Sequence, residues 1–200
     1  MKKLADKLPA INVQKTALVV MDYQHAILKS LNQPEALLTK ASETIRMVRG
    51  YGVRVAYVRV AFDDADFASF PETSGMRVHA LKGRHIFHKN ALEAAIHPTV
   101  APKPGDIIVR KTRMGAFSTT NLDERLRENG IHTLLLAGIS TGGVVLSTVR
   151  EGYDRDYRIF VLQDICADSD PDVHTFLTGR IFPQQTHVIQ TEQLKPLFKR

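Results

Sequence analysis

Apolar runs of strand length alternate along the chain with segments whose apolar residues recur at helical spacing. This alternation is typical of a parallel sheet whose consecutive strands are joined by helices. The expected strands cover residues 17–21, 53–60, 107–110, 133–137, 158–163 and 186–189. We therefore predict an α/β fold, a three-layer α/β/α sandwich around a six-stranded, mostly parallel, Rossmann-like sheet with strand order 3-2-1-4-5-6.

The length and composition of the chain are those of one ordinary globular domain. The 200 residues are 44% hydrophobic and 24% charged, and no repeat, linker or low-complexity stretch interrupts them. A chain of this size buries most of its apolar surface without a disulfide or a metal. We expect a single domain over residues 1–200. Within it, residues 34–50 form an amphipathic helix, residues 62–100 form a long excursion, and residues 144–156 form a helix.

The charge and the apolar runs restrict the partners and the compartment. The net charge is +6, but the basic residues are dispersed, which argues against a nucleic-acid partner and favours an anionic small-molecule substrate. No apolar run approaches the roughly 20 residues of a membrane span, and the amino terminus lacks a signal-peptide core. The single cysteine, Cys166, suits a reducing compartment, so we expect a cytoplasmic protein.

The candidate catalytic and binding residues lie at the ends of three expected strands. Asp22 ends the first expected strand, Lys111 follows the third, and a glycine-rich turn over residues 138–143 follows the fourth. Ligands of open parallel sheets bind beyond the carboxyl ends of the strands. A carboxylate, an ammonium group and the backbone amides of a tight turn are therefore expected in one pocket.

The segments around these residues resemble the isochorismatase-like hydrolases over most of the chain. They are VVMDYQ, VRKTRMGAF and GISTGGVVLSTVREGYDRDY leading into VLQDICAD. In the cysteine members of that superfamily the aspartate is a general base, the lysine helps to activate a thiolate, and turn amides stabilise the oxyanion. Counted from Gly138 and Thr141, the cysteine position falls on Val144, which has no nucleophilic atom. The resemblance also implies a homo-oligomer.

The isochorismatases proper also lack this cysteine and cleave a vinyl ether with the aspartate as general acid. The leading hypothesis is accordingly a small-molecule hydrolase that uses Asp22 as general acid or base and Lys111 as its electrostatic partner, with water as the nucleophile. The alternative is a pseudoenzyme that serves as a ligand-binding or assembly protein. Burial raises the pKa of a carboxyl and an ion pair lowers it, and the sequence leaves open which effect prevails at Asp22. The expected substrate-binding residues are Gln24, Arg113, Phe117, Ser140, Thr141 and Val144.

Further expectations concern geometry and cofactors. The carboxylate of Asp22 and the amine of Lys111 are expected within about 4 Å of each other or joined by one bridging water. Val144 is expected to open its helix with its side chain facing the same pocket. The resemblance implies a cis peptide bond between Ile139 and Ser140. Cys166 is expected past the fifth strand as a small buried hydrophobe. We expect no metal and no cofactor, because the histidine spacing matches no compact zinc signature and the turn lacks the nucleotide-binding motifs.

Overall fold

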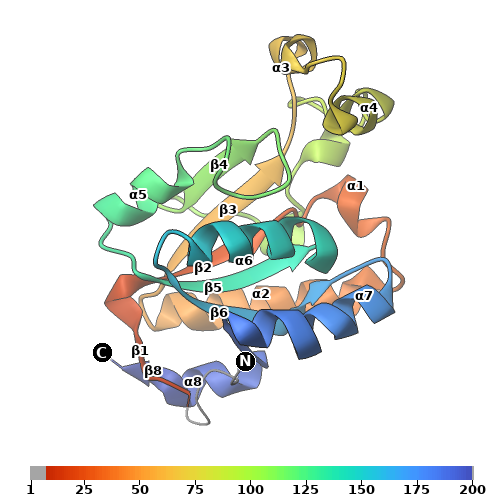
Figure 1. Ribbon diagram of the computed structural model, residues 1–200. Helices are drawn as coiled ribbons and strands as arrows, with labels where there is room; N and C mark the ends of the chain where they lie inside the picture. Colours follow the sequence, from red (N-terminus) through yellow and green to blue (C-terminus); the bar gives the residue numbers. More distant parts are fainter. Residues whose placement is uncertain (1–7, 200) are drawn as a thin grey trace.

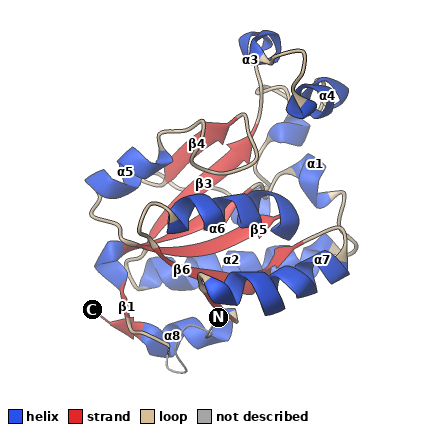
Figure 2. Cartoon of the chain, in the orientation of Figure 1, coloured by secondary structure: helices blue, strands red, loops and turns tan. Residues whose placement is uncertain are grey.

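The computed structural model describes residues 8–199 and contains one six-stranded sheet in which every pair of neighbouring strands is parallel. The strand order is β4-β3-β2-β5-β6-β7, which is the predicted order, so the predicted fold class is confirmed. Helices cover both faces of the sheet (Figures 1 and 2). The strands of this sheet are β2 (Thr16–Met21), β3 (Arg54–Val60), β4 (Ile107–Lys111), β5 (Thr133–Ile139), β6 (Arg158–Ala167) and β7 (His187–Ile189).

Two apolar clusters form the core, one on each face of the sheet. Successive residues of a strand point to opposite faces, and accordingly Val19 belongs to one cluster while Leu18 and Val20 belong to the other.

The α-helices are α1 (His25–Leu28), α2 (Pro34–Gly50), α3 (Asp64–Ser69), α4 (Gly75–Lys82), α5 (Leu122–Glu128), α6 (Leu146–Tyr153), α7 (Pro171–Phe176) and α8 (Leu194–Leu197). None of the helices within residues 8–199 is long and apolar enough to cross a membrane.

Helix α2 has the bounds that the sequence predicts. Pro34 occupies the start of the helix, where its missing N–H costs nothing. The apolar residues at helical spacing, among them Leu38, Ile45 and Val48, are buried against the sheet. A short second sheet lies near the chain ends, where β1 (Ile11–Asn12) pairs in parallel with β8 (Phe198–Lys199).

Strand β6 is longer than predicted, which corrects the position of Cys166. The apolar run ends near Leu162, and the polar pair Gln163 and Asp164 suggested the end of the strand. The strand instead continues to Ala167 after a register shift opposite residues 136–138 of β5, and Cys166 pairs there with Gly138. A bulge of this kind lets a strand carry polar residues and still rejoin its neighbour. Cys166 therefore lies within the strand and not past it.

The excursion over residues 62–100 holds α3, α4 and two single 3₁₀ turns, Leu92–Ala94 and Pro98–Val100. Helices α3 and α4 project beyond the edge of the sheet where the strands end (Figure 1). A reciprocal pair of hydrogen bonds between Asp63 and Asp66 fixes the start of α3. The excursion thus adds walls to the region beyond the strand ends.

Candidate functional site

Asp22 and Lys111 form a buried ion pair at the carboxyl ends of two strands. β2 ends at Met21 and β4 ends at Lys111, while β3 lies between them. The Lys111 Nζ atom lies 2.8 Å from Oδ2 of Asp22, and their side chains are 2% and 5% exposed. The expected distance of about 4 Å or less is confirmed. An ion pair this deeply buried is screened much less by dissolved salt than an exposed pair is.

Lys111 uses its remaining donors inside the protein. Its ammonium group donates to the carbonyl oxygen of Met114 at 2.8 Å and to that of Arg113 at 3.2 Å. With the bond to Asp22, these contacts account for the three N–H groups of the side chain. The second oxygen of Asp22, Oδ1, is buried and has no hydrogen-bond partner within residues 8–199. Lys111 is therefore a fixed charge, and Oδ1 of Asp22 is left without a hydrogen-bond partner among the described residues.

The pKa of Asp22 is raised above the ordinary value of an aspartate. Burial of the carboxyl is the largest influence, and it outweighs the charge and the hydrogen bond of Lys111, which lower the pKa. The question that the sequence left open is answered in favour of desolvation. Asp22 consequently holds a proton at a higher pH than an exposed aspartate does.

The glycine-rich turn leads from β5 into a π-helical segment, Thr141–Val145, which continues as α6. The peptide bond between Ile139 and Ser140 is cis, as the resemblance implied. Val144 is the fourth residue of the π-helical segment and does not open the helix as we expected, but it lines the same cavity as Asp22. The amides of Gly143 and Val145 both donate to the carbonyl oxygen of Ser140.

Asp168 and His174, which we did not predict from the sequence, form hydrogen bonds to this turn. The Thr141 hydroxyl and Nδ1 of His174 are hydrogen-bonded at 2.8 Å, and the Gly142 amide donates to Oδ2 of Asp168 at 2.7 Å. Burial lowers the pKa of His174, which favours the neutral imidazole at this contact. Asp168 follows β6 and His174 lies on α7, so only the assembled fold brings them to the turn. They position the backbone of the turn and do not line the cavity.

The cavity in front of the ion pair has a volume of about 360 Å³. Its walls are mainly apolar, and its charged lining residues are Asp22, Lys111 and Arg113. The Arg113 guanidinium lies 4.2 Å from the centre of the Phe70 ring, which holds it beside the cavity. Among the described residues, the other lining residues are Ala26, Ile27, Ser30, Val60, Met76, Phe87, Met114, Ile139, Ser140, Val144 and Ser169.

Three of the residues expected to bind substrate lie outside this lining. The Gln24 side chain is fully buried and bonds to the backbone of Val60 and Ala94, which ties α1 to the end of β3 and to the excursion. Phe117 stacks on Tyr157 in the core, with ring centres 5.9 Å apart. Thr141 contacts His174 as described. Arg113, Ser140 and Val144 are the expected residues that the fold brings to Asp22.

Removing the Thr141 hydroxyl tests the support behind the turn. We expect Thr141→Val to lower the free energy of unfolding by about 1 to 3 kcal/mol, because a buried polar partner loses its hydrogen bond. Urea denaturation measures the change. Thr39→Val, at an exposed position of α2, is the matched control and is expected to change stability by less than about 0.5 kcal/mol. Equal stabilities of the two variants would contradict the proposed support.

Cys166 is buried and does not line the cavity. Burial is the largest influence on its thiol and raises the pKa to about 12. A thiol that stays protonated reacts slowly with alkylating agents and disulfide reagents, because the thiolate is the reactive form. We expect no modification of the native protein near neutral pH and one modified thiol after denaturation, as counted by mass spectrometry. Rapid modification of the folded protein would contradict this placement.

No group of three or more histidine, cysteine, aspartate or glutamate side chains suited to a metal ion occurs within residues 8–199.

The family model of the isochorismatase domain matches residues 16–193, so the chain belongs to the isochorismatase family. It is 30% identical over 188 residues to the uncharacterized isochorismatase family protein YecD of Escherichia coli O157:H7, which covers 92% of this chain and 96% of that protein.

Two named enzymes are also similar to the chain. Ureidoacrylate amidohydrolase RutB of Methylorubrum extorquens is 28% identical over 182 residues, covering 81% of this chain and 73% of that enzyme. The crystal structure of N-carbamoylsarcosine amidase from Thermoplasma acidophilum superimposes with a TM-score of 0.72 at 29% identity, covering 90% of this chain and 99% of that one.

Proposed function

We propose that this protein is an isochorismatase-like hydrolase that acts on a small molecule, and that its mechanism uses no cysteine nucleophile. The observation that carries the proposal is the buried pair of Asp22 and Lys111 at a cavity that Val144 also lines. From the sequence resemblance we assign Val144 to the position of the family cysteine. A valine wall supplies no atom for covalent catalysis. The reaction therefore uses water as the nucleophile and Asp22 as the group that moves the proton.

The raised pKa of Asp22 suits it to general acid catalysis. In its protonated form, Asp22 donates a proton from Oδ1 to the leaving atom of the substrate as the scissile bond breaks. Water adds to the substrate carbon, and its proton returns to Asp22, which restores the acid. Lys111 stabilises the carboxylate that exists between the two transfers, and its three hydrogen bonds keep it in place.

Backbone amides of the turn are the proposed donors to the developing negative charge. The amides of Gly142, Gly143 and Val145 already donate within residues 8–199. We assign the role to the amides of Ser140 and Val144, whose residues line the cavity. The hydrogen bonds of the turn to His174 and Asp168 then hold these donors in position.

The cavity favours a small anionic substrate with an apolar body. Arg113 is the cationic lining residue that is not bonded to Asp22, and a guanidinium group suits a carboxylate. The surrounding side chains are apolar, including Ile27, Met76 and Phe87. The relatives that cleave ureidoacrylate and N-carbamoylsarcosine make carboxylate-bearing amides the first compounds to test, followed by vinyl ethers.

A ligand-binding or assembly protein without catalysis is the second candidate. Two observations favour it. Val144 offers no nucleophile at the cavity, and Lys111 uses all three of its donors inside the protein, so it offers no free ammonium group to a ligand. A substrate panel run on the wild type, Asp22→Asn and Lys111→Ala separates the two candidates. Turnover that both variants lose supports the hydrolase, whereas binding of the panel without turnover supports the second candidate.

The single domain, the cytoplasmic location and the homo-oligomer remain proposals alongside this function. The domain proposal is supported by the family match over residues 16–193. The exposed apolar side chains of α4, Val78 and Leu81, are suited to a contact between subunits. Sedimentation equilibrium of the full chain measures the oligomeric state directly.

A further inference from the structure

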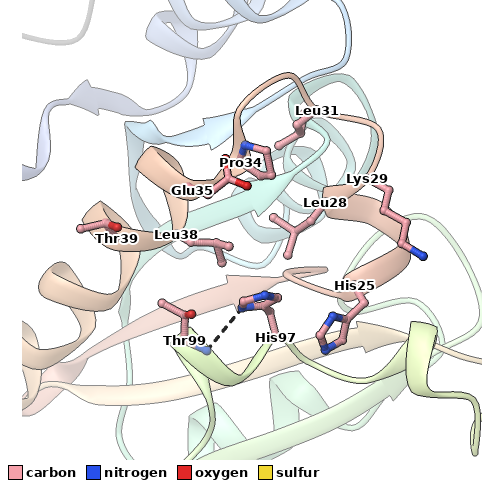
Figure 3. A pocket seen from close by; sticks show the side chains of 10 residues that line it. All are labelled: His25, Leu28, Lys29, Leu31, Pro34, Glu35, Leu38, Thr39, His97 and Thr99. Carbon is pink, nitrogen blue, oxygen red and sulfur yellow. Dashed lines mark hydrogen bonds between the residues drawn. The ribbon is translucent and has the colours of Figure 1, made fainter.

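A second and larger cavity, of about 520 Å³, lies between α1, the start of α2 and the segment that contains His97 (Figure 3). It shares no lining residue with the cavity at Asp22. Its apolar side is formed by Leu28, Leu31 and Leu38, and its polar side by His25 and His97. The two cavities lie on either side of α1, whose Ala26 and Ile27 line the cavity at Asp22 while His25 and Leu28 line this one.

The imidazole rings of His25 and His97 lie next to each other at this cavity. Their centres are 4.8 Å apart, and Figure 3 shows them next to each other below Leu28 and Leu38. Nδ1 of His97 accepts a hydrogen bond from the Thr99 amide at 3.3 Å. The neutral ring must then carry its proton on Nε2, which makes that atom a donor and unsuited to coordinate a metal ion.

We propose that this cavity is a binding site for a small monocarboxylate with an aliphatic chain. The carboxylate accepts hydrogen bonds from the imidazoles of His25 and His97, and the chain lies against the leucine side chains. The exposed side chains of Lys29 and Glu35 place one charge of each sign at the rim. Because these two charges offset each other, the rim adds no net attraction for a second negative group, and a monocarboxylate fits the site.

The neutral form of His97 is the form suited to this site. Burial is the largest influence on the pKa of His97 and lowers it, and the neighbouring His25 lowers it further. A second proton on this ring would occupy Nδ1 and break the hydrogen bond from the Thr99 amide. The other charged groups that face the pair are Lys29 on the α1 side and Glu35 on α2. The carboxylate is therefore expected to bind to the neutral ring of His97.

The experiment is a titration of the full chain with hexanoate, followed by NMR, with hexanamide as the neutral control. We expect hexanoate to shift the ring signals of His25 and His97 and the amide signals of Leu28 and Thr99. His97→Gln and His25→Gln are each expected to weaken binding by about tenfold, the loss of one hydrogen bond to a charged group. His132→Gln, at an exposed position outside both cavities, is the matched control and is expected to bind as the wild type does.

The cavity at Asp22 is lined by the cationic side chain of Arg113, which also attracts a carboxylate. The experiment must therefore distinguish binding at the two cavities. Arg113→Leu removes that cation, and hexanoate binding at the histidine pair is expected to persist in this variant. Equal binding of hexanamide, shifts confined to residues 140–144, or loss of binding in Arg113→Leu would each overturn the proposal. Two single histidine variants, each checked by thermal denaturation, keep the test valid if one of them fails to fold.

Discussion

Replacement of Asp22 by asparagine is expected to lower kcat/KM for a hydrolysed substrate by about 10²- to 10⁴-fold, the usual contribution of a general acid or base. Asparagine keeps the size of the side chain and removes the ionisable carboxyl that gives and takes the proton. Among residues 8–199, Asp22 is the one carboxyl residue on the cavity lining, so no neighbouring carboxyl replaces it. Steady-state kinetics on the substrate that the panel identifies measures the change.

The matched control is Asp106→Asn. Asp106 also pairs with a cation, Arg49, but it precedes β4 and therefore lies at the opposite end of that strand from Lys111. We expect this variant to keep the wild-type kcat/KM. If Asp22→Asn retained more than about a tenth of the wild-type kcat/KM while remaining folded, general acid–base catalysis by Asp22 would be excluded.

Replacement of Lys111 by methionine is expected to raise the pKa of Asp22 further, because the charge and hydrogen bond of Lys111 are the leading influences that lower it. A carboxyl whose pKa is higher in the folded state than in the unfolded chain stabilises the fold in acid. That stability is lost as the pH rises through the folded-state pKa. The variant is therefore expected to approach wild-type stability in acid and to lose about 3 to 5 kcal/mol of unfolding free energy at alkaline pH.

Urea denaturation between about pH 5 and pH 9 measures this loss. Lys195→Met removes an exposed lysine and is expected to change stability by less than about 0.5 kcal/mol at every pH. A loss of stability in Lys111→Met that did not depend on pH would show that Asp22 stays charged without its partner. The pH profile of activity is expected to shift toward higher pH in the same variant, if the variant is active.

The sheet was predictable because its strands are continuous apolar runs separated by helices of clear period. The parallel sheet and the bounds of α2 followed from these patterns, and the strand order is the one that a Rossmann-like arrangement implies. The end of β6 did not, because the bulge opposite β5 depends on a neighbouring strand and leaves no apolar signal in residues 163–164. Helix α1 was also missed, since a single turn of four residues is too short to show a helical period.

The site was predictable as far as it depends on strand ends. Asp22 and the turn follow strands and Lys111 is the last residue of one, and parallel strands bring such positions together. Gln24 and Phe117 have the right neighbours in sequence, but their side chains bond or stack inside the fold. The contact of His174 with Thr141 joins residues 33 positions apart through α7, and no local pattern encodes it.

The backbone of Asp22 limits how its side chain can be studied. With φ at 59°, Asp22 adopts the left-handed conformation that aspartate, asparagine and glycine tolerate better than other residues do. An alanine variant would remove the carboxylate and also force the chain to leave or to strain this turn, so its loss of function would have two causes. An asparagine variant changes the chemistry alone. The same restriction acts on natural sequence change, because few single substitutions at this position would preserve the path of the chain from β2 into α1.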